Sequence, residues 1–413
     1  MKPRGISRNV LALGWVSFFT DLASEMLYPI MPLFLIGTLG ASPAILGLVD
    51  GIAEGISSGL RWIAGALSDR WGRRKPPVFF GYLVSAVSKP VIGLATFGGW
   101  PIFLLGRTAD RLGKSIRTSP RDALIADSTE PEFRGKAFGF HRAMDTCGAI
   151  LGPLVALAVI VAFAGFRATF SAHWTGGENA IARLPLARLF YLAIIPGLIS
   201  ASIVLVFVRE IRPAENRAAT PPSILQSFPR PFWNLLIANA VFSLGNSSDA
   251  FLILRSGELG LGFGAIVLAY VLYNAIFAAT ATPLGAVSDR LGRKGVIAAG
   301  WIVYGVVYLG FAVWPSTAAP WVLLAVYGLY QALTDGVAKA MVSDLVPAAQ
   351  RAGAIGLFYT VSGVGQLLAS LVAGVIWNIR PGGVVIALAA AAGLALVAAF
   401  LISNIKLREK NES

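Results

Sequence analysis

Long apolar runs of about twenty residues recur along the whole chain, and no other feature constrains its fold as strongly. A helix that crosses a bilayer needs about 20 predominantly apolar residues. Only 13% of the 413 residues are charged, whereas about a quarter of the residues in soluble domains are charged. The sequence therefore predicts an all-α membrane protein with twelve transmembrane helices. The expected spans are 10–37, 43–66, 77–97, 101–124, 136–164, 187–208, 232–254, 262–284, 295–314, 320–343, 352–377 and 382–403.

Basic residues cluster in alternate connections between these spans, which explains the net charge of +13. Lys and Arg gather before the first span, after the second, fourth and eighth, in the middle of the chain and at its end. Because cytoplasmic loops carry the excess of Lys and Arg, we expect a multi-pass inner-membrane protein with both termini cytoplasmic. Without a basic tail or a recognition fold, nucleic acid is not an expected partner.

One motif occurs twice. GALSDRWGRRK at 65–75 recurs as GAVSDRLGRKG at 285–295, each time between the second and third spans of its half. Such a repeat predicts two pseudo-symmetric six-helix bundles. The expected N-terminal bundle is 1–209 and the C-terminal bundle is 232–413. Segment 210–231 is rich in Pro, Ala and charge, so we expect a cytoplasmic linker there.

The two copies resemble the cytoplasmic loop signature of the major facilitator superfamily, G-x-x-x-D-R-x-G-R-R/K. This resemblance implies a transporter in which the two halves rock against one another and a latch in this loop makes and breaks. Asp69 would accept helix N-terminal amides, and Arg73 and Arg74 would hold Asp122 or Asp127. The matching residues are Gly65, Asp69, Arg70, Gly72, Arg73 and Arg74, and Gly285, Asp289, Arg290, Gly292, Arg293 and Lys294.

The fifth expected span carries G-x-x-x-G-P at Gly148, Gly152 and Pro153. This resembles the first half of the antiporter signature of drug:proton exchangers, although Ala156 and Leu157 stand where its next glycine pair would be. The blocks 114–128 and 138–153 are similar to prokaryotic members without an assigned substrate. Arg107 lies where the superfamily has its fourth-helix arginine.

Charged residues inside the expected spans are candidate functional residues, because each costs several kcal/mol at bilayer depth unless it is paired or hydrated. The N-terminal half holds six such acids and six bases, so pairing between helices is an equally open role for any one of them. The candidates for proton coupling or substrate binding are Asp21, Glu25, Asp50, Glu54, Arg107, Asp110, Arg111, Arg142 and Asp145, with Asn246, Asp249, Asn274 and Asp335 in the other half.

Asp21 and Glu25 are four residues apart and therefore share one helix face. Protonation could neutralise such a carboxylate and release a conformational lock, with Arg107 and Arg111 as permanently charged partners. Since the C-terminal half has fewer charges, we expect the N-terminal half to couple protons and the C-terminal half to shape the substrate pocket.

The leading interpretation is a monomeric secondary transporter that moves a small organic compound outward through the lipid bilayer, driven by the proton gradient. No cofactor is expected, because the chain lacks a nucleotide-binding G-x-x-x-x-G-K-[ST] loop. Two other cargoes stay open. Asp21, Glu25, Asp50 and Glu54 offer oxygen ligands to a divalent metal as substrate, and Arg107, Arg111 and Arg142 could bind an organic anion. A membrane sensor or enzyme is the alternative of another class.

Overall fold

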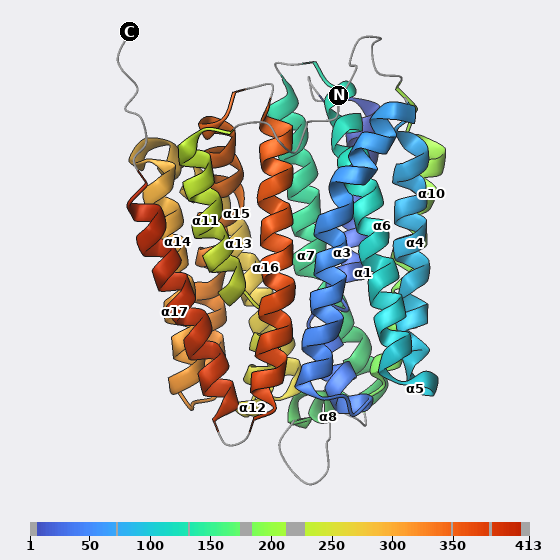
Figure 1. The fold of residues 1–413 in the computed structure, drawn as a ribbon. Coiled ribbons are helices and arrows are strands. Elements are labelled where there is room, and N and C mark those ends of the chain that lie inside the picture. The colour runs from blue at the N-terminus through green and yellow to red at the C-terminus, as the bar shows by residue number, and fades with distance from the viewer. Residues whose placement is uncertain are drawn as a thin grey trace.

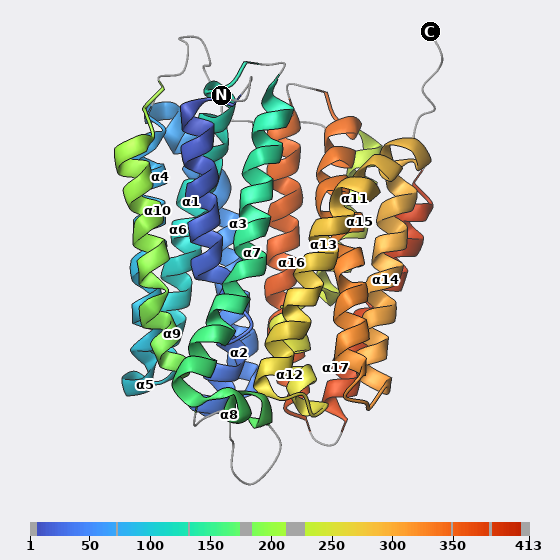
Figure 2. The same cartoon turned by 180° about the vertical axis from the view of Figure 1, so that it is seen from behind.

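The computed structural model describes residues 6–71, 73–130, 133–173, 184–211, 228–347, 350–379 and 382–405, with side chains for all of these except 59, 61–71, 135, 351 and 352. Its helices run lengthwise through one bundle (Figure 1). Helix α1 begins and helix α17 ends at the same end of the bundle, which we call the terminal end (Figures 1 and 2). We call the opposite end the distal end.

The N-terminal half forms six helical rods, three of which are divided. The first rod is α1, α2 and the π-helix η1, the third is α4 and α5, and the sixth is α9 and α10. Their bounds are α1 Arg8–Glu25, α2 Met31–Leu33, η1 Phe34–Thr38, α3 Pro43–Trp71, α4 Lys75–Gly93, α5 Ala95–Gly98, α6 Trp100–Asp127, α7 Arg134–Ala164, α9 Leu186–Leu192 and α10 Ile194–Phe207, with the short α8 Phe166–Ser171 after α7.

The C-terminal half forms six more rods beside the first set, and only its first rod is divided. Figure 2 shows α13 beside α7, while Figure 1 shows α16 beside α3. The helices are α11 Arg230–Gly245, α12 Ala250–Glu258, α13 Phe263–Leu291, α14 Arg293–Val313, α15 Ala319–Leu345, α16 Arg351–Trp377 and α17 Gly383–Ser403.

Seven of the described helical segments are long and apolar enough to cross a membrane by length and composition alone. The other rods are interrupted or more polar, and they carry most of the buried charge. The outer surface is rich in exposed apolar side chains, such as Phe97, Val206 and Phe400, which are 85%, 66% and 69% exposed. A surface of this kind suits lipid rather than water. The seven segments are Lys136–Ala164, Leu186–Phe207, Arg230–Glu258, Phe263–Leu291, Arg293–Val313, Gly353–Trp377 and Gly383–Ser403.

The first rod of each half is broken near its middle, where the sequence predicted continuous spans. The first break follows Glu25, in a stretch that contains Pro29, and proline cannot continue the backbone hydrogen-bond ladder. The second break is residues 246–249, between α11 and α12. Side chains of other helices form hydrogen bonds with backbone groups at this break. The Tyr304 hydroxyl donates to the Gly245 carbonyl at 2.9 Å, and the Ser370 hydroxyl accepts from the Ser248 amide at 3.1 Å.

Glycines bring helix backbones into contact at two places that shape the candidate site. A Cβ at Gly148 of α7 would lie 2.5 Å from the Phe18 carbonyl oxygen of α1. A Cβ at Gly113 of α6 would lie 2.6 Å from the Gly81 carbonyl oxygen of α4. Small residues allow this close approach between membrane helices. The two contacts fix α1 against α7 and α4 against α6.

A third glycine contact joins the two halves in the distal half of the bundle, between α3 and α16. A Cβ at Gly51 would lie 3.0 Å from the Leu367 carbonyl oxygen, and one at Gly374 would lie 2.6 Å from the Pro43 carbonyl oxygen. We call this contact the glycine seam. It leaves no room for a side chain between the two backbones.

Candidate functional site

A polar cavity of about 40 Å³ lies between α1, α2, α4 and α6, inside the N-terminal half. A water molecule needs about 10–15 Å³ of this kind of volume, so the cavity has room for two or three. Eight of its twelve lining residues are charged, which sets it apart from an apolar packing defect. The lining residues are Asp21, Ser24, Glu25, Tyr28, Met31, Lys89, Ile92, Arg107, Asp110, Arg111, Lys114 and Arg117.

Two buried arginines of α6 are paired with carboxylates of α3. Arg107 Nε lies 3.3 Å from Asp50 Oδ1, and Arg111 Nη2 lies 2.9 Å from Glu54 Oε1. The spacing of four residues on each helix puts both pairs on facing surfaces. Arg107 and Arg111 therefore hold α3 carboxylates, rather than Asp21 and Glu25 of α1.

A third buried pair joins α4 to α6. Lys89 Nζ lies 3.3 Å from Asp110 Oδ1, and the Ser85 hydroxyl donates to the same oxygen at 2.5 Å. Lys89 also donates to the Ser85 carbonyl at 2.9 Å. Lys89 and Asp110 are 2% and 6% exposed, so this pair is removed from water.

The close approach of α1 and α7 brings two carboxyl groups together. Asp21 of α1 and Asp145 of α7 are near enough to interact electrostatically, and two neighbouring carboxyls of like charge favour keeping a proton on one of them. The Ser17 hydroxyl donates to Asp145 Oδ1 at 2.7 Å. This acid pair can therefore hold one proton between the first and fifth rods.

Arg142 connects the acid pair to the C-terminal half. Its Nη1 lies 3.1 Å from Asp145 Oδ2, and its Nη2 lies 3.4 Å from Asp335 Oδ2 on α15. Asp335 also lies 3.7 Å from Lys339 Nζ, one turn along the same helix. One guanidinium thus bridges a carboxylate in each half.

Two hydrogen bonds join the halves nearer the distal end. The Tyr270 hydroxyl donates to Glu25 Oε2 at 2.8 Å, and the Ser248 hydroxyl donates to Asp50 Oδ2 at 2.7 Å. Asp50 therefore bonds both Arg107 in its own half and the broken rod of the other half. Acids of the N-terminal half contact the partner half directly.

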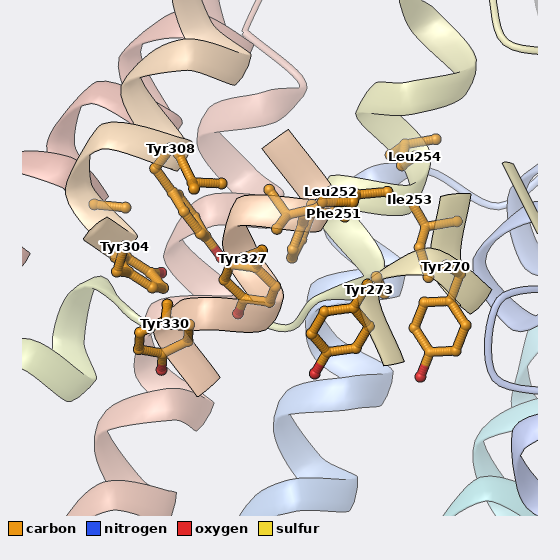
Figure 3. Close-up of a cluster of buried hydrophobic side chains, with 14 of the residues drawn as sticks. Phe251, Leu252, Ile253, Leu254, Tyr270, Tyr273, Tyr304, Tyr308, Tyr327 and Tyr330 are labelled. Carbon is orange, nitrogen blue, oxygen red and sulfur yellow. The ribbon is translucent and has the colours of Figure 1, made fainter. Parts of the chain in front are cut away.

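A cluster of buried tyrosines fills the C-terminal half beside its broken rod (Figure 3). The Tyr327 hydroxyl donates to Asp249 Oδ1 at 2.7 Å. Tyr28 stacks on Tyr270 with ring centroids 5.6 Å apart, so the aromatic contacts continue to the N-terminal cavity. The cluster members are Tyr270 and Tyr273 of α13, Tyr304 and Tyr308 of α14, and Tyr327 and Tyr330 of α15.

The other two predicted polar positions take part in local backbone structure. Asn246 begins the break after α11, and its backbone N–H donates to the Ser243 carbonyl at 3.2 Å. The Asn274 side chain donates within its own helix, to the Tyr270 carbonyl at 3.4 Å.

The two signature loops lie at the terminal end, and each has an arginine that pairs with an aspartate near the end of another helix. Arg74 Nε is 3.6 Å from Asp127 Oδ2 at the end of α6, and Arg293 Nε is 2.6 Å from Asp344 Oδ2 at the end of α15. Gly292 has φ +91°, a conformation that favours glycine. Gly65 lies in α3, whereas Gly72 and the side chains of Asp69 and Arg70 lie outside the described part of the chain.

Two acids near the first signature loop make contacts that the sequence did not predict, namely Asp122 and Glu210. Asp122 pairs with its neighbour Arg121 at 2.8 Å. Glu210 accepts from the Arg74 and Lys75 amides at 2.8 and 3.0 Å, so it occupies the start of α4, where the helix dipole favours an anion. In the second loop, Asp289 lies 3.4 Å from Arg293. The predicted positions Gly285, Arg290, Gly152 and Pro153 lie in α13 and α7.

Sequence reasoning missed Arg117, Ser17, Ser248 and Glu210. Arg117 had a signal, because it continues the charged stripe of α6 by one more turn. Serines are too common in membrane helices to attract notice. Glu210 stood in what was expected to be linker.

The acids suggested as ligands for a divalent metal substrate are divided among other partners. Glu54 faces Arg111, and Glu25 accepts from Tyr270. Within the described part of the chain, no three His, Cys, Asp or Glu side chains form a group that could hold a metal ion.

Comparison with known proteins agrees with this architecture. The family model of the Major Facilitator Superfamily matches residues 13–256 and 235–413. An uncharacterized MFS-type transporter of Methanocaldococcus jannaschii is 39% identical over 384 residues, covering 92% of this chain and 90% of that one. The multidrug resistance protein MdtH of Photorhabdus laumondii is 31% identical over 130 residues, covering 32% of each chain.

Solved structures of the same fold include the nucleoside transporter NupG, with a TM-score of 0.75 and 15% identity over 96% of this chain and 100% of that one. A bacterial homologue of the lysosomal transporter Spinster gives 0.72 and 18% over 96% of each chain. These matches confirm the predicted all-α transporter fold and favour a transporter over an enzyme. The chain belongs to the major facilitator superfamily.

Proposed function

We propose that this protein is a proton-coupled secondary transporter that exports a small organic solute across the inner membrane by alternating access. The acid pair Asp21–Asp145 and the bridging Arg142 are the observation that carries the proposal. The partial similarity to a multidrug resistance protein supports export.

The terminal end is the cytoplasmic side in this proposal. At this end Arg73 and Arg74 precede α4, and Arg293 and Lys294 begin α14. Cytoplasmic ends and loops are enriched in Lys and Arg. The glycine seam then closes the outer side of the bundle, so the arrangement corresponds to a transporter shut toward the outside.

The proton would act through the shared arginine. When the acid pair holds one proton, it carries one negative charge for Arg142. When that proton leaves, the pair carries two, and Arg142 is drawn toward Asp145 and away from Asp335 on α15. A change in proton occupancy thus alters the contact between the halves, which is the differential interaction that coupling requires. The other charged groups acting on the pair are Glu25 of α1, Lys114 and Arg121 of α6, and Arg142 of α7.

The test uses purified protein in liposomes that contain a trapped pH-sensitive dye. Cationic drugs, sugars, organic anions and divalent metals are added in turn, and proton movement is recorded with each. We expect one class to drive proton flux in the wild type. Asp145→Asn should abolish that flux while still exchanging labelled solute for unlabelled solute across the membrane.

Glu130→Gln is the control, because Glu130 is an exposed acid in the connection after α6. This variant should retain wild-type proton flux. Full proton coupling in both Asp145→Asn and Asp21→Asn would disprove the role of the acid pair. Solute flux without any pH change in the wild type would replace the proposal with a uniporter.

A further inference from the structure

Arg117 is a buried cation that the proposed proton site leaves unexplained. It lies on α6, lines the cavity and is only 5% exposed. Its guanidinium lies over the Tyr82 ring at 4.6 Å. Its Nε and Nη1 atoms are buried without a hydrogen-bond partner. Burying a charge without an acceptor is costly, so this geometry points to an acceptor that enters the cavity from outside the chain.

The neighbouring basic residues contrast with Arg117. Arg107, Arg111 and Lys89 each face a carboxylate within 3.3 Å. No ion pair with a carboxylate reaches Arg117 among the side chains that the structure describes. Arg111 also keeps its Nε without a partner. Two arginines that line the same cavity therefore have N–H groups available to one acceptor.

The charge of Arg117 favours an anion over water as that acceptor. Two or three waters would fill the space and accept hydrogen bonds, but they bring no countercharge to Arg117. A carboxylate or phosphate group occupies a similar volume and accepts two parallel hydrogen bonds from one guanidinium. Arg107, Arg111 and Lys89 are already balanced by Asp50, Glu54 and Asp110, so an entering anion would balance the charge of Arg117.

We propose that the cavity binds the carboxylate or phosphate group of an anionic solute, with Arg117 as the main ligand and Arg111 Nε as a second donor. This inference rests on the proposed transport function and narrows its cargo to small anions. Arg117 presents several N–H donors in one fixed plane to this group, an arrangement that a lysine ammonium lacks.

The test measures binding rather than transport. Full-length protein in detergent is titrated with inorganic phosphate, sulfate and acetate by calorimetry, and its thermal unfolding is followed at each concentration. A ligand that binds only the folded state stabilises it in proportion to its affinity and concentration. We expect at least one of these anions to bind the wild type and raise its unfolding temperature.

Arg188→Met is a matched control, because Arg188 lies over the Phe163 ring at 4.7 Å but is exposed and outside the cavity. This variant should bind like the wild type. Arg117→Met should lose at least tenfold in affinity, yet unfold no more easily than the wild type without anion, since it removes an unpaired buried charge. Arg117→Lys keeps the charge and covers the case in which the methionine variant does not fold. It should bind more weakly than the wild type.

The inference is overturned if none of the three anions binds the wild type at millimolar concentration. It is also overturned if Arg117→Lys and Arg188→Met bind with wild-type affinity. Anion binding that depends on Arg117 without proton flux in liposomes would leave the site in place and reject the proposed coupling. Proton flux driven only by cationic drugs, with no anion binding, would support the proposed coupling and reject the anion site.

Discussion

The Lys89–Asp110 pair offers a direct test of how buried charge holds this bundle together. At 3.3 Å and an effective dielectric constant of 20, the attraction between the two charges is about 5 kcal/mol. Removing one member leaves the other buried and unpaired, which costs about 3–5 kcal/mol. We therefore expect Lys89→Met, which keeps most of the unbranched side chain and removes its charge, to lower the free energy of unfolding by about that amount.

The assay is reversible unfolding in mixed detergent micelles, followed by the fluorescence of the ten tryptophans. The double variant Lys89→Met with Asp110→Asn should recover most of the loss, because it removes both charges. Lys339→Met is the control for a more exposed pair with Asp335, and exposed pairs contribute about 0–1 kcal/mol. A loss in Lys89→Met no larger than in Lys339→Met, or no recovery in the double variant, would refute the reasoning.

Three further predictions concern packing and hydrogen bonds. Gly148→Ala should lower stability by about 1–3 kcal/mol in the same unfolding assay through overpacking against α1, whereas Gly139→Ala on the same helix, where a Cβ meets open space, should be tolerated. Tyr327→Phe removes the donor from the half-buried Asp249 carboxyl and should lower stability by about 1.5–3 kcal/mol in the same assay, whereas an unchanged stability would show that this hydrogen bond contributes nothing. Glu210→Ala removes acceptors from two amides at the start of α4 and should cost about 0.5–2 kcal/mol. Hydrogen exchange should then speed up in the first turn of α4, and unchanged exchange there would contradict the capping role.

The arrangement of spans could be predicted from the sequence, because the thickness of a bilayer fixes the length of each apolar run. The breaks in the first and seventh spans could not. Pro29 is consistent with the first break. At the second break, Gly245 and the polar residues after it are equally typical of a continuous, kinked helix. The backbone groups of the second break that lack helical partners are hydrogen-bonded by Tyr304 and Ser370. These contacts come from other helices, so they depend on tertiary packing.

The candidate residues of the N-terminal half could be found from the sequence, but their partners could not. A charged stripe on one helix fixes a face, and several neighbouring helices can present a carboxylate to it. Asp21 and Asp50 were both reasonable partners for Arg107, and helix packing decides for Asp50. Arg117 could not be singled out from the sequence for the same reason, since only the packed structure shows that no carboxylate among the described side chains forms an ion pair with it.

The glycine seam has a consequence for the entropy of the transport cycle. A glycine has no side-chain rotamers, so bringing α3 against α16 at Gly51 and Gly374 freezes no side chain at these positions, whereas ordering a long side chain costs up to about 2 kcal/mol. The seam can therefore form and part with little entropic cost of its own. Polar contacts across the halves, such as that between Asp50 and Ser248, then contribute to the balance between an open and a closed distal end.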